Sequence, residues 1–279
     1  MKVLSILNNK GGVGKTTIAT WLGQGIALTG KKVLLIDNDK QHNLSNALAK
    51  SLRTKSVRDI YRIDSIENIN RLLNRTVQQT SVDGLYFIPS SAQLSYFDVP
   101  HIDIWKEVLE KSSIPKVFDA VIFDNAPGSE LLQASTVSAS DMVVVPSELN
   151  TKSSEGLFEL CVWLDRTMGM SLKRIRIVPN GMRRRRKDEG YLQMLQKRFP
   201  GAVTTAIPFD DVFDEMDALR KVMFFSRMKA KVMPFVIKVM CEIYEGMESV
   251  EAIEEHLHHK QKAFKAEQAR KRYWERRKA

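Results

Sequence analysis

A glycine-rich segment near the start of the chain has the composition of a loop that holds phosphate groups. Residues 8–17 read NNKGGVGKTT and follow a short apolar run at residues 2–7. In such a loop, backbone N–H groups and the N-terminus of the following helix point at a phosphate. The Lys15 ammonium could then reach the outer phosphate oxygens, and the Thr16 hydroxyl could bind Mg²⁺. The order of strand, loop and helix therefore predicts a nucleotide-binding site.

Acidic side chains follow two further apolar runs, where they could assist phosphoryl transfer. Asp37 and Asp39 come directly after residues 32–36, and Asp124 comes after residues 120–123. Because the carboxyl ends of parallel strands meet at one edge of a sheet, we expect these carboxylates to face the nucleotide crevice. Transfer of a phosphoryl group to water needs a metal to neutralise charge and a group to orient the water. These carboxylates are suited to both tasks.

Strand-like and helical segments alternate through most of the chain. Apolar runs fall at residues 2–7, 32–36, 85–89, 120–123, 142–146 and 175–179, with a weaker one at 203–208, and helical patterns fall at 16–29, 156–167 and 190–198. This alternation predicts an α/β fold with a doubly wound, mainly parallel sheet and helices on both faces. We expect one domain over residues 1–247 and a basic, helical C-terminal tail over residues 248–279.

The charge of the chain is concentrated in two segments. The chain of 279 residues has 43 Lys and Arg, 33 Asp and Glu, and a net charge of +10, and its 43% apolar content excludes a disordered protein. Residues 183–187 read RRRRK, and residues 255–279 hold nine Lys or Arg against three Glu. The rest of the chain is therefore close to neutral. An acidic partner, such as nucleic acid or an anionic membrane, would meet these two segments.

Cysteines and hydropathy point to an intracellular protein without a membrane span. Cys161 and Cys241 each lie in an apolar helical pattern, which favours buried, reduced thiols. The first apolar run is too short for a signal peptide, and no segment approaches the ~20 apolar residues of a transmembrane helix. We therefore expect a cytoplasmic protein.

The phosphate loop departs from the common spacing and resembles the loop of a known family. Asn9 stands where the common pattern has its first glycine, and Lys10 precedes the glycine pair. The pattern KGGxGKT[ST] is similar to the deviant Walker A ATPases, which include the ParA/Soj partition proteins, MinD and the nitrogenase iron protein. The resemblance implies a P-loop NTPase fold, hydrolysis of ATP with Mg²⁺, and a homodimer when ATP is bound. In that dimer Lys10 would touch the partner's nucleotide.

The resemblance also implies roles for individual residues. Nucleotide binding would involve Lys10, Gly11, Gly12, Val13, Gly14, Lys15, Thr16 and Thr17, with Asn180 and Pro208 beside the base. Lys10, Lys15 and Asp39 would be catalytic, with Asp39 positioning the attacking water. Thr16, Asp37 and Asp124 would hold Mg²⁺. The chain departs from the family pattern at Lys40, where a proline is usual, and at Phe209, where an arginine is common.

Further segments favour the ParA/Soj branch of that family. Residues 88–94, 140–148 and 215–222 are similar to three ParA motifs, and because the phosphate loop starts at residue 10 we expect no helix-turn-helix domain before it. The nitrogenase branch needs cysteine ligands in loops, whereas Cys161 and Cys241 of this chain lie in helical patterns. The MinD branch needs an amphipathic membrane helix, and the tail, with adjacent Tyr273 and Trp274, lacks an apolar stripe. Nucleic acid therefore suits the basic charge better than a membrane, and the tail could equally be a solvated helix with no partner.

The resemblance thus implies an ATPase that partitions DNA. Its ATP-bound dimer would bind DNA non-specifically through Arg183, Arg184, Arg185 and Arg186, which places the protein on the nucleoid. A centromere-binding, ParB-like adaptor would stimulate hydrolysis and release the dimer. Two alternatives stay open, namely a MinD-like positioning ATPase on a membrane and a ParA-like protein that positions a protein cargo on the nucleoid.

Overall fold

A mainly parallel sheet forms the centre of the molecule. The computed structural model describes residues 1–49, 55–183, 185–219, 222–245 and 247–278. The strands of this part are β1 (Lys2–Ile6), β2 (Val33–Asn38), β3 (Gln78–Gln79), β4 (Leu85–Ile88), β5 (Ala120–Asn125), β6 (Met142–Glu148) and β7 (Ile175–Asn180). They lie in the order β3-β4-β2-β5-β1-β6-β7, with β3 antiparallel to β4 and every other pair parallel. The predicted α/β fold is confirmed.

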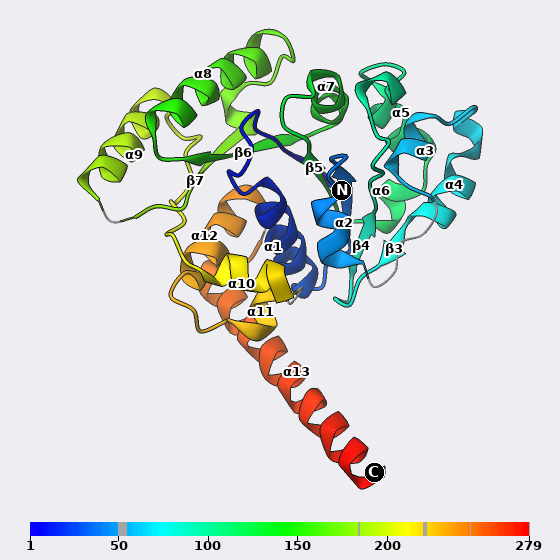
Figure 1. The fold of residues 1–279 in the computed structure, drawn as a ribbon, viewed down its shortest axis with the longest axis vertical. Helices are drawn as coiled ribbons and strands as arrows, with labels where there is room; N and C mark the ends of the chain where they lie inside the picture. Colours follow the sequence, from blue (N-terminus) through cyan, green and yellow to red (C-terminus); the bar gives the residue numbers. More distant parts are fainter. Residues whose placement is uncertain (50–54, 184, 220–221, 246, 279) are drawn as a thin grey trace.

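Helices cover both faces of this sheet (Figure 1). The described α-helices are α1 (Lys15–Leu28), α2 (Asn43–Leu48), α3 (Val57–Tyr61), α4 (Ile69–Thr76), α5 (Ile104–Lys111), α6 (Ile114–Val117), α7 (Glu130–Ser138), α8 (Thr151–Arg166), α9 (Arg186–Arg198), α10 (Val212–Leu219), α11 (Met223–Ser226), α12 (Met233–Ile243) and α13 (Val250–Lys278), and the 3₁₀ turns are η1 (Ile66–Asn68), η2 (Tyr96–Asp98) and η3 (Leu172–Arg174). One face packs on α1, α11, α12 and the start of α13, and the other packs on α3–α5 and α7–α9.

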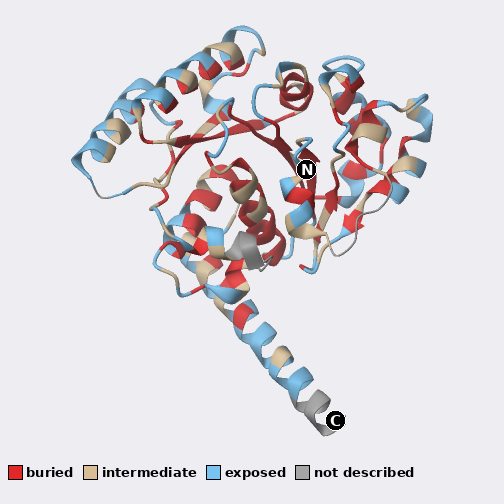
Figure 2. Cartoon of the chain, in the orientation of Figure 1, coloured by how far each residue is buried: buried red, intermediate tan, exposed pale blue. Residues whose placement is uncertain are grey.

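The strands are apolar on both faces because both faces are covered. In β2, Val33 and Leu35 join the core on the α1 side, whereas Leu34 and Ile36 join the core on the α3 side. All four side chains are fully buried, and Figure 2 shows the central strands buried throughout. This is the reason why the strands read as continuous apolar runs rather than as an alternating pattern.

The two ends of the sheet differ from the sequence-based expectation. The expected strand at residues 203–208 forms only isolated bridges, from Val203 to Ile177 and from Pro208 to Met182. The N–H groups of Thr204, Ile207 and Phe209 still donate to the carbonyl oxygens of Ile177, Pro179 and Met182, so the segment follows β7 and its extension without forming a continuous ladder. At the other end, β3 was missed because Gln78 and Gln79 show no apolar pattern.

The tail forms a long helix whose first turns belong to the core. Ile253 and Leu257 of α13 are buried in the α1-side core, and the Phe264 ring stacks on Phe225 with 4.4 Å between centroids. Beyond that contact the helix projects away from the body, as Figures 1 and 2 show. None of the described helices is long and apolar enough to cross a membrane. The division into residues 1–247 and 248–279 stays a prediction.

The two cysteines lie in helices, as expected, but only one is fully buried. Cys161 of α8 is buried, and burial raises the pKa of its thiol to about 12. Cys241 of α12 is half-buried, and burial also raises its pKa. Both thiols are free.

Candidate nucleotide site

The phosphate loop joins β1 to α1 through two glycines in the left-handed region. Gly12 has φ +75° and Gly14 has φ +93°, and Gly14 immediately precedes the first turn of α1. A Cβ atom on Gly14 would collide with the side-chain amide of Asn180. The loop therefore requires glycine at this position for both its backbone conformation and its close packing.

Lys15 is a buried lysine held by the loop's own carbonyl groups. Its Nζ donates to the carbonyl oxygens of Asn8 and Lys10, each at 3.1 Å, and the residue is 8% exposed. Burial lowers the pKa of Lys15, while Asp124 and then Asp39 oppose this shift. An anion in the loop would offer Lys15 stronger partners than these carbonyls.

Asn8, which sequence reasoning missed, anchors the start of the loop. Its buried side chain donates to the carbonyl oxygen of Pro146 at 2.7 Å and accepts from the backbone N–H of Lys10 at 2.9 Å. The second contact is the local turn that asparagine favours, and an asparagine directly after a buried strand was the available signal.

The acidic residues meet at the carboxyl ends of β2 and β5. Asp37 is paired in register with Asp124 on the neighbouring strand. Thr16 Oγ1 donates to Asp124 Oδ2 at 2.7 Å, and the backbone N–H of Asp39 donates to Asp37 Oδ1 at 3.2 Å. The structure thus brings together four residues from three separate segments, as the sequence predicted.

Burial disfavours the ionised form of the two carboxylates at the strand ends and so raises their pKa values. Burial raises the pKa of Asp124 to about 8, and the neighbouring Asp37 adds to this shift. Burial likewise raises the pKa of Asp37 to about 6, although two hydrogen bonds from Ser45, at 2.6 Å from Oγ and 2.8 Å from N–H, favour its charged form. Two adjacent buried carboxylates would be stabilised by a cation between them.

The chemistry of this cluster fits Mg²⁺. Asp124 Oδ1 is a buried oxygen without a hydrogen-bond partner among the described residues, and the neighbouring groups are a threonine hydroxyl and a second carboxylate. Nowhere among the described residues do three or more His, Cys, Asp or Glu side chains come close enough to hold a metal by themselves. Magnesium commonly uses one or two carboxylates together with substrate phosphates and water, so Thr16, Asp37 and Asp124 suffice only when a nucleotide is present.

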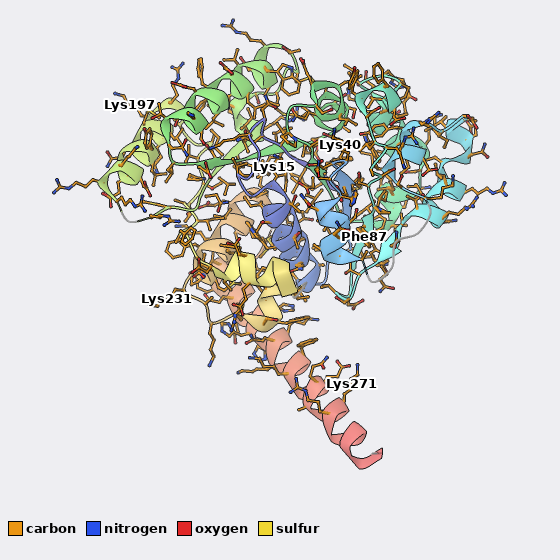
Figure 3. All side chains as sticks on the ribbon, viewed as in Figure 1. Lys15, Lys40, Phe87, Lys197, Lys231 and Lys271 are labelled. Carbon is orange, nitrogen blue, oxygen red and sulfur yellow. The ribbon has the colours of Figure 1, made fainter. Side chains whose placement is uncertain are left out.

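A cavity of about 720 Å³ opens next to these groups. Its wall includes Gly11, Gly12, Gly14, Lys15, Thr16, Thr17, Asp39, Gln41, Asn43, Asn46, Ala47 and Pro127. Figure 3 places Lys15 and Lys40, the neighbour of Asp39, in the central region of the molecule. Gln41, Asn43 and Asn46 were missed by sequence reasoning, although the polar stretch after Asp39 was a signal for them. The volume lies within the range of small-molecule sites.

Lys10 is directed to the start of α8 rather than into this cavity. Its Nζ forms an ion pair with Glu148 and donates to Ser153 Oγ at 2.9 Å. The side chains of Lys10 and Glu148 are 40% and 42% exposed. The hydrogen bond from Lys10 is the main cause that holds the pKa of Glu148 below its usual value. No sequence motif indicates this pair, because 138 residues separate its members.

Asn180 contacts the phosphate loop, whereas Pro208 pairs with the segment that follows Asn180. Asn180, at the end of β7, donates from Nδ2 to the carbonyl oxygen of Val13 at 3.0 Å. Pro208 is bridged to Met182, two residues beyond Asn180. Asn180 is therefore coupled to the loop itself, and recognition of the base by either residue stays a prediction.

The arginine segment is exposed and follows β7 directly. Arg183 lies over the Phe209 ring at 3.8 Å from its centroid, Arg185 precedes α9, and Arg186 begins it. All three are exposed. Arg184 lies outside the described residues. Phe209 occupies the position where the family commonly has an arginine. Its ring instead forms a cation–π contact with the guanidinium group of Arg183.

Comparison with known proteins places these features in a family. A family model described as an AAA domain matches residues 1–177. The chain is 35% identical over 165 residues to the sporulation initiation inhibitor protein Soj of Bacillus subtilis, covering 57% of this chain and 63% of that protein. It is 32% identical over 183 residues to the chromosome partitioning protein ParA of Caulobacter vibrioides, covering 63% of this chain and 67% of that protein. The chain therefore spans less than two thirds of the Soj relative.

Solved structures share the fold over almost their entire length. An ATP complex of a Cyanothece McdA variant has a TM-score of 0.73 at 20% identity, covering 89% of this chain and 98% of that one. The cell division ATPase MinD of Pyrococcus furiosus has a TM-score of 0.67 at 21% identity, covering 87% and 98%. The matched family model, the Soj and ParA relatives and the phosphate-loop geometry agree, and the chain belongs to this AAA domain family within the ParA/MinD superfamily of ATPases.

Proposed function

We propose that this protein is an ATPase that partitions DNA. ATP and Mg²⁺ bind at the edge of the sheet and drive formation of a sandwich homodimer. The dimer binds DNA non-specifically on the nucleoid, and a ParB-like adaptor at a centromere-like site stimulates hydrolysis and releases it. Support comes from a relative named as a chromosome partitioning protein and from the arrangement of the site.

The observation that carries the proposal is the meeting of Lys15, the Thr16–Asp124 pair and Asp39 at one cavity. Lys15 would exchange its two carbonyl partners for phosphate oxygens. Asp39 lies in the wall of the cavity, where its carboxylate would orient water for attack on the terminal phosphate. Bound Mg²⁺, held by Thr16, Asp37 and Asp124, would neutralise the charge that develops on the phosphate oxygens.

The position of Lys10 supports a dimer. Its side chain leaves its own cavity and is half-exposed, so it is accessible to a second copy of the chain. Its pair with Glu148 is also half-exposed, and pairs of this kind contribute at most about 1 kcal/mol. Contact with the partner's nucleotide would therefore cost little in the free protein.

The position of the arginine segment supports nucleotide-dependent DNA binding. The segment begins three residues after Asn180, whose side chain holds the phosphate-loop carbonyl of Val13. A change in the loop on nucleotide binding would therefore act close to Arg183, Arg185 and Arg186. Exposed arginines bind the DNA backbone through phosphate contacts, which carry little sequence information.

The contacts of α13 argue against a membrane anchor. Its apolar residues Ile253, Leu257 and Phe264 pack on the body. In the described side chains beyond Phe264, up to Arg272, the helix presents polar and charged residues together with alanines. A membrane-binding helix needs a free apolar face next to its basic one. Figure 3 shows Lys271 on this projecting part, far from Lys15.

Sedimentation with two carriers tests the proposal. The full chain with ATP and Mg²⁺ is spun with random-sequence DNA or with anionic lipid vesicles, and ADP serves as the nucleotide control. We expect ATP-dependent sedimentation with DNA and none with vesicles. Sedimentation with vesicles alone would favour the MinD-like alternative.

Lys10→Ala should retain ATP binding as a monomer, and ATP-dependent dimers of this variant would remove the role given to Lys10.

A further inference from the structure

A second cavity, of about 700 Å³, lies between α3 and α4 and carries a strongly basic lining. Five cationic side chains line it, namely Lys55, Arg58, Arg62, Arg71 and Arg75. The acidic residues in its wall are Asp59 and Asp64. The lining therefore has a net charge of +3, whereas the partition function proposed above assigns it no role.

Some of these cationic side chains interact with an acidic residue, and others have no hydrogen bond or ion pair among the described residues. Buried Asp98 accepts from Nε of Arg58 at 3.0 and 3.1 Å and lies 3.8 Å from Nε of Arg62. The terminal nitrogens of both guanidinium groups have no hydrogen bond among the described residues. Arg71 and Arg75, both exposed on α4, have no hydrogen bond or ion pair in that part of the chain either. Several guanidinium groups can thus bind a ligand in addition to their present contacts.

The cavity lies at the edge of the sheet where ligands bind in this class of fold. Ser91 and Gln93 of its wall follow the carboxyl end of β4, and β4 neighbours β2, which carries the nucleotide-site carboxylates. The backbone around it is fixed, since the N–H of Val57 donates to the carbonyl oxygen of Pro89 at 2.8 Å, and the N–H of Ser90 donates to Ser45 Oγ at 2.9 Å. Crevices outside the carboxyl ends of strands are the usual binding sites in open α/β sheets.

We propose that this cavity is a second anion site, which binds a small ligand with several phosphate groups. Guanidinium groups bind phosphate oxygens in pairs, so the four arginines match a ligand with more than one phosphate. No aromatic ring occurs among the described lining residues, so the lining is dominated by groups that bind phosphate rather than by aromatic rings that stack on a nucleobase. A concave site of this volume suits a compact polyanion better than a duplex.

Titration of the full chain with tripolyphosphate tests the proposal. The variant Lys15→Ala serves as the background, because tripolyphosphate would otherwise also bind the phosphate loop. We expect this background to bind tripolyphosphate in calorimetry. Addition of Arg71→Ala and Arg75→Ala should weaken binding about tenfold or more, since each charge-assisted contact contributes strongly. A matched pair, Arg166→Ala with Lys173→Ala, removes two exposed cations near α8 and should leave affinity within about twofold.

Three results would overturn the proposal. One is the absence of tripolyphosphate binding in the Lys15→Ala background. Another is an equal loss of affinity in the matched pair, which would indicate general attraction of anions. The last is a loss of DNA affinity on changing Arg71 and Arg75 with tripolyphosphate binding unaltered, which would assign the cavity to DNA. The two arginine changes, made in the otherwise unaltered chain, should leave ATP binding intact, which establishes that the fold is preserved and separates this proposal from the proposed ATPase function.

Discussion

The edge of the sheet and the basic surfaces of this molecule use charge in opposite ways. At the edge, Lys15, Asp37 and Asp124 are buried, and each forms a hydrogen bond with a defined partner. On the surface, Arg183, Arg185 and the described cations of α13 beyond Phe264, such as Lys271, are exposed. Buried charges interact strongly and shift each other's pKa values, whereas exposed charges are screened by salt.

The difference between the buried site and the exposed basic segments determines how each should respond to substitutions. A buried cluster depends on single atoms, so one substitution should abolish its chemistry. An exposed basic segment acts through the number of its cations, so substitutions should have graded effects that depend on salt. The proposed function needs both, because the first region would switch the second.

The largest effect should come from Lys15→Ala. This change removes the buried ammonium that would hold the phosphates, with charge-assisted contacts of about 1.5–3 kcal/mol each, so ATP affinity should fall roughly 100-fold or more. DNA binding in the presence of ATP should be lost with it. Equilibrium binding of a fluorescent ATP analogue and of DNA measures both. Lys31→Ala, at an exposed position after α1, is the control. ATP-dependent DNA binding by the Lys15 variant would exclude this phosphate-loop site as the one that controls DNA binding.

Asp39→Ala should separate binding from hydrolysis. The loop would keep its contacts to the phosphates, but the group that orients water is gone, so turnover should fall on the order of 100-fold. The ATP-bound dimer should then stay on DNA. Phosphate release and DNA retention are measured together, with Asp165→Ala on the exposed side of α8 as the control. Unchanged turnover would exclude Asp39 from the reaction.

Replacing the exposed arginines should have a smaller, graded effect. With Arg183, Arg185 and Arg186 changed to Ala, DNA affinity should fall, and the slope of log affinity against log salt should decrease by roughly one for each arginine that binds a phosphate. ATP turnover should persist, because these side chains lie outside the described wall of the cavity. If affinity and slope stay the same, the basic C-terminal helix becomes the region that binds DNA.

A different kind of effect, on stability rather than on binding or turnover, is expected in the pH dependence of unfolding. The folded chain raises the pKa of Asp124 from 3.8 to about 8, so between these values the folded state holds a proton that the unfolded state has lost. The free energy of unfolding of the nucleotide-free protein should therefore decrease as pH rises toward about 8. Asp124→Asn should flatten this dependence in thermal melts between about pH 5.5 and 8.5. A slope identical to that of the unaltered chain would mean that Asp124 is already ionised.

The sequence predicted the central strands well, because each is a continuous apolar run, whereas the nucleotide-binding roles of the loop residues that follow them stay predictions. Asp37 and Asp124 could be matched to a shared edge before their register was known. The pair of Lys10 and Glu148 could not, since it depends on how β6 lies beside β1. The arginine-lined cavity was missed because its residues come from segments that show no motif.

Binding of DNA at increasing salt, measured with ATP, with ADP and without nucleotide, tests the link between the two regions most directly. We predict tight binding only with ATP and Mg²⁺, and a steep decrease in affinity with salt, as expected of phosphate contacts. Lys10→Ala should remove the ATP-dependent part and leave weak binding in all three conditions. Equal affinity with ATP, with ADP and without nucleotide would contradict control of the basic surface by the buried site.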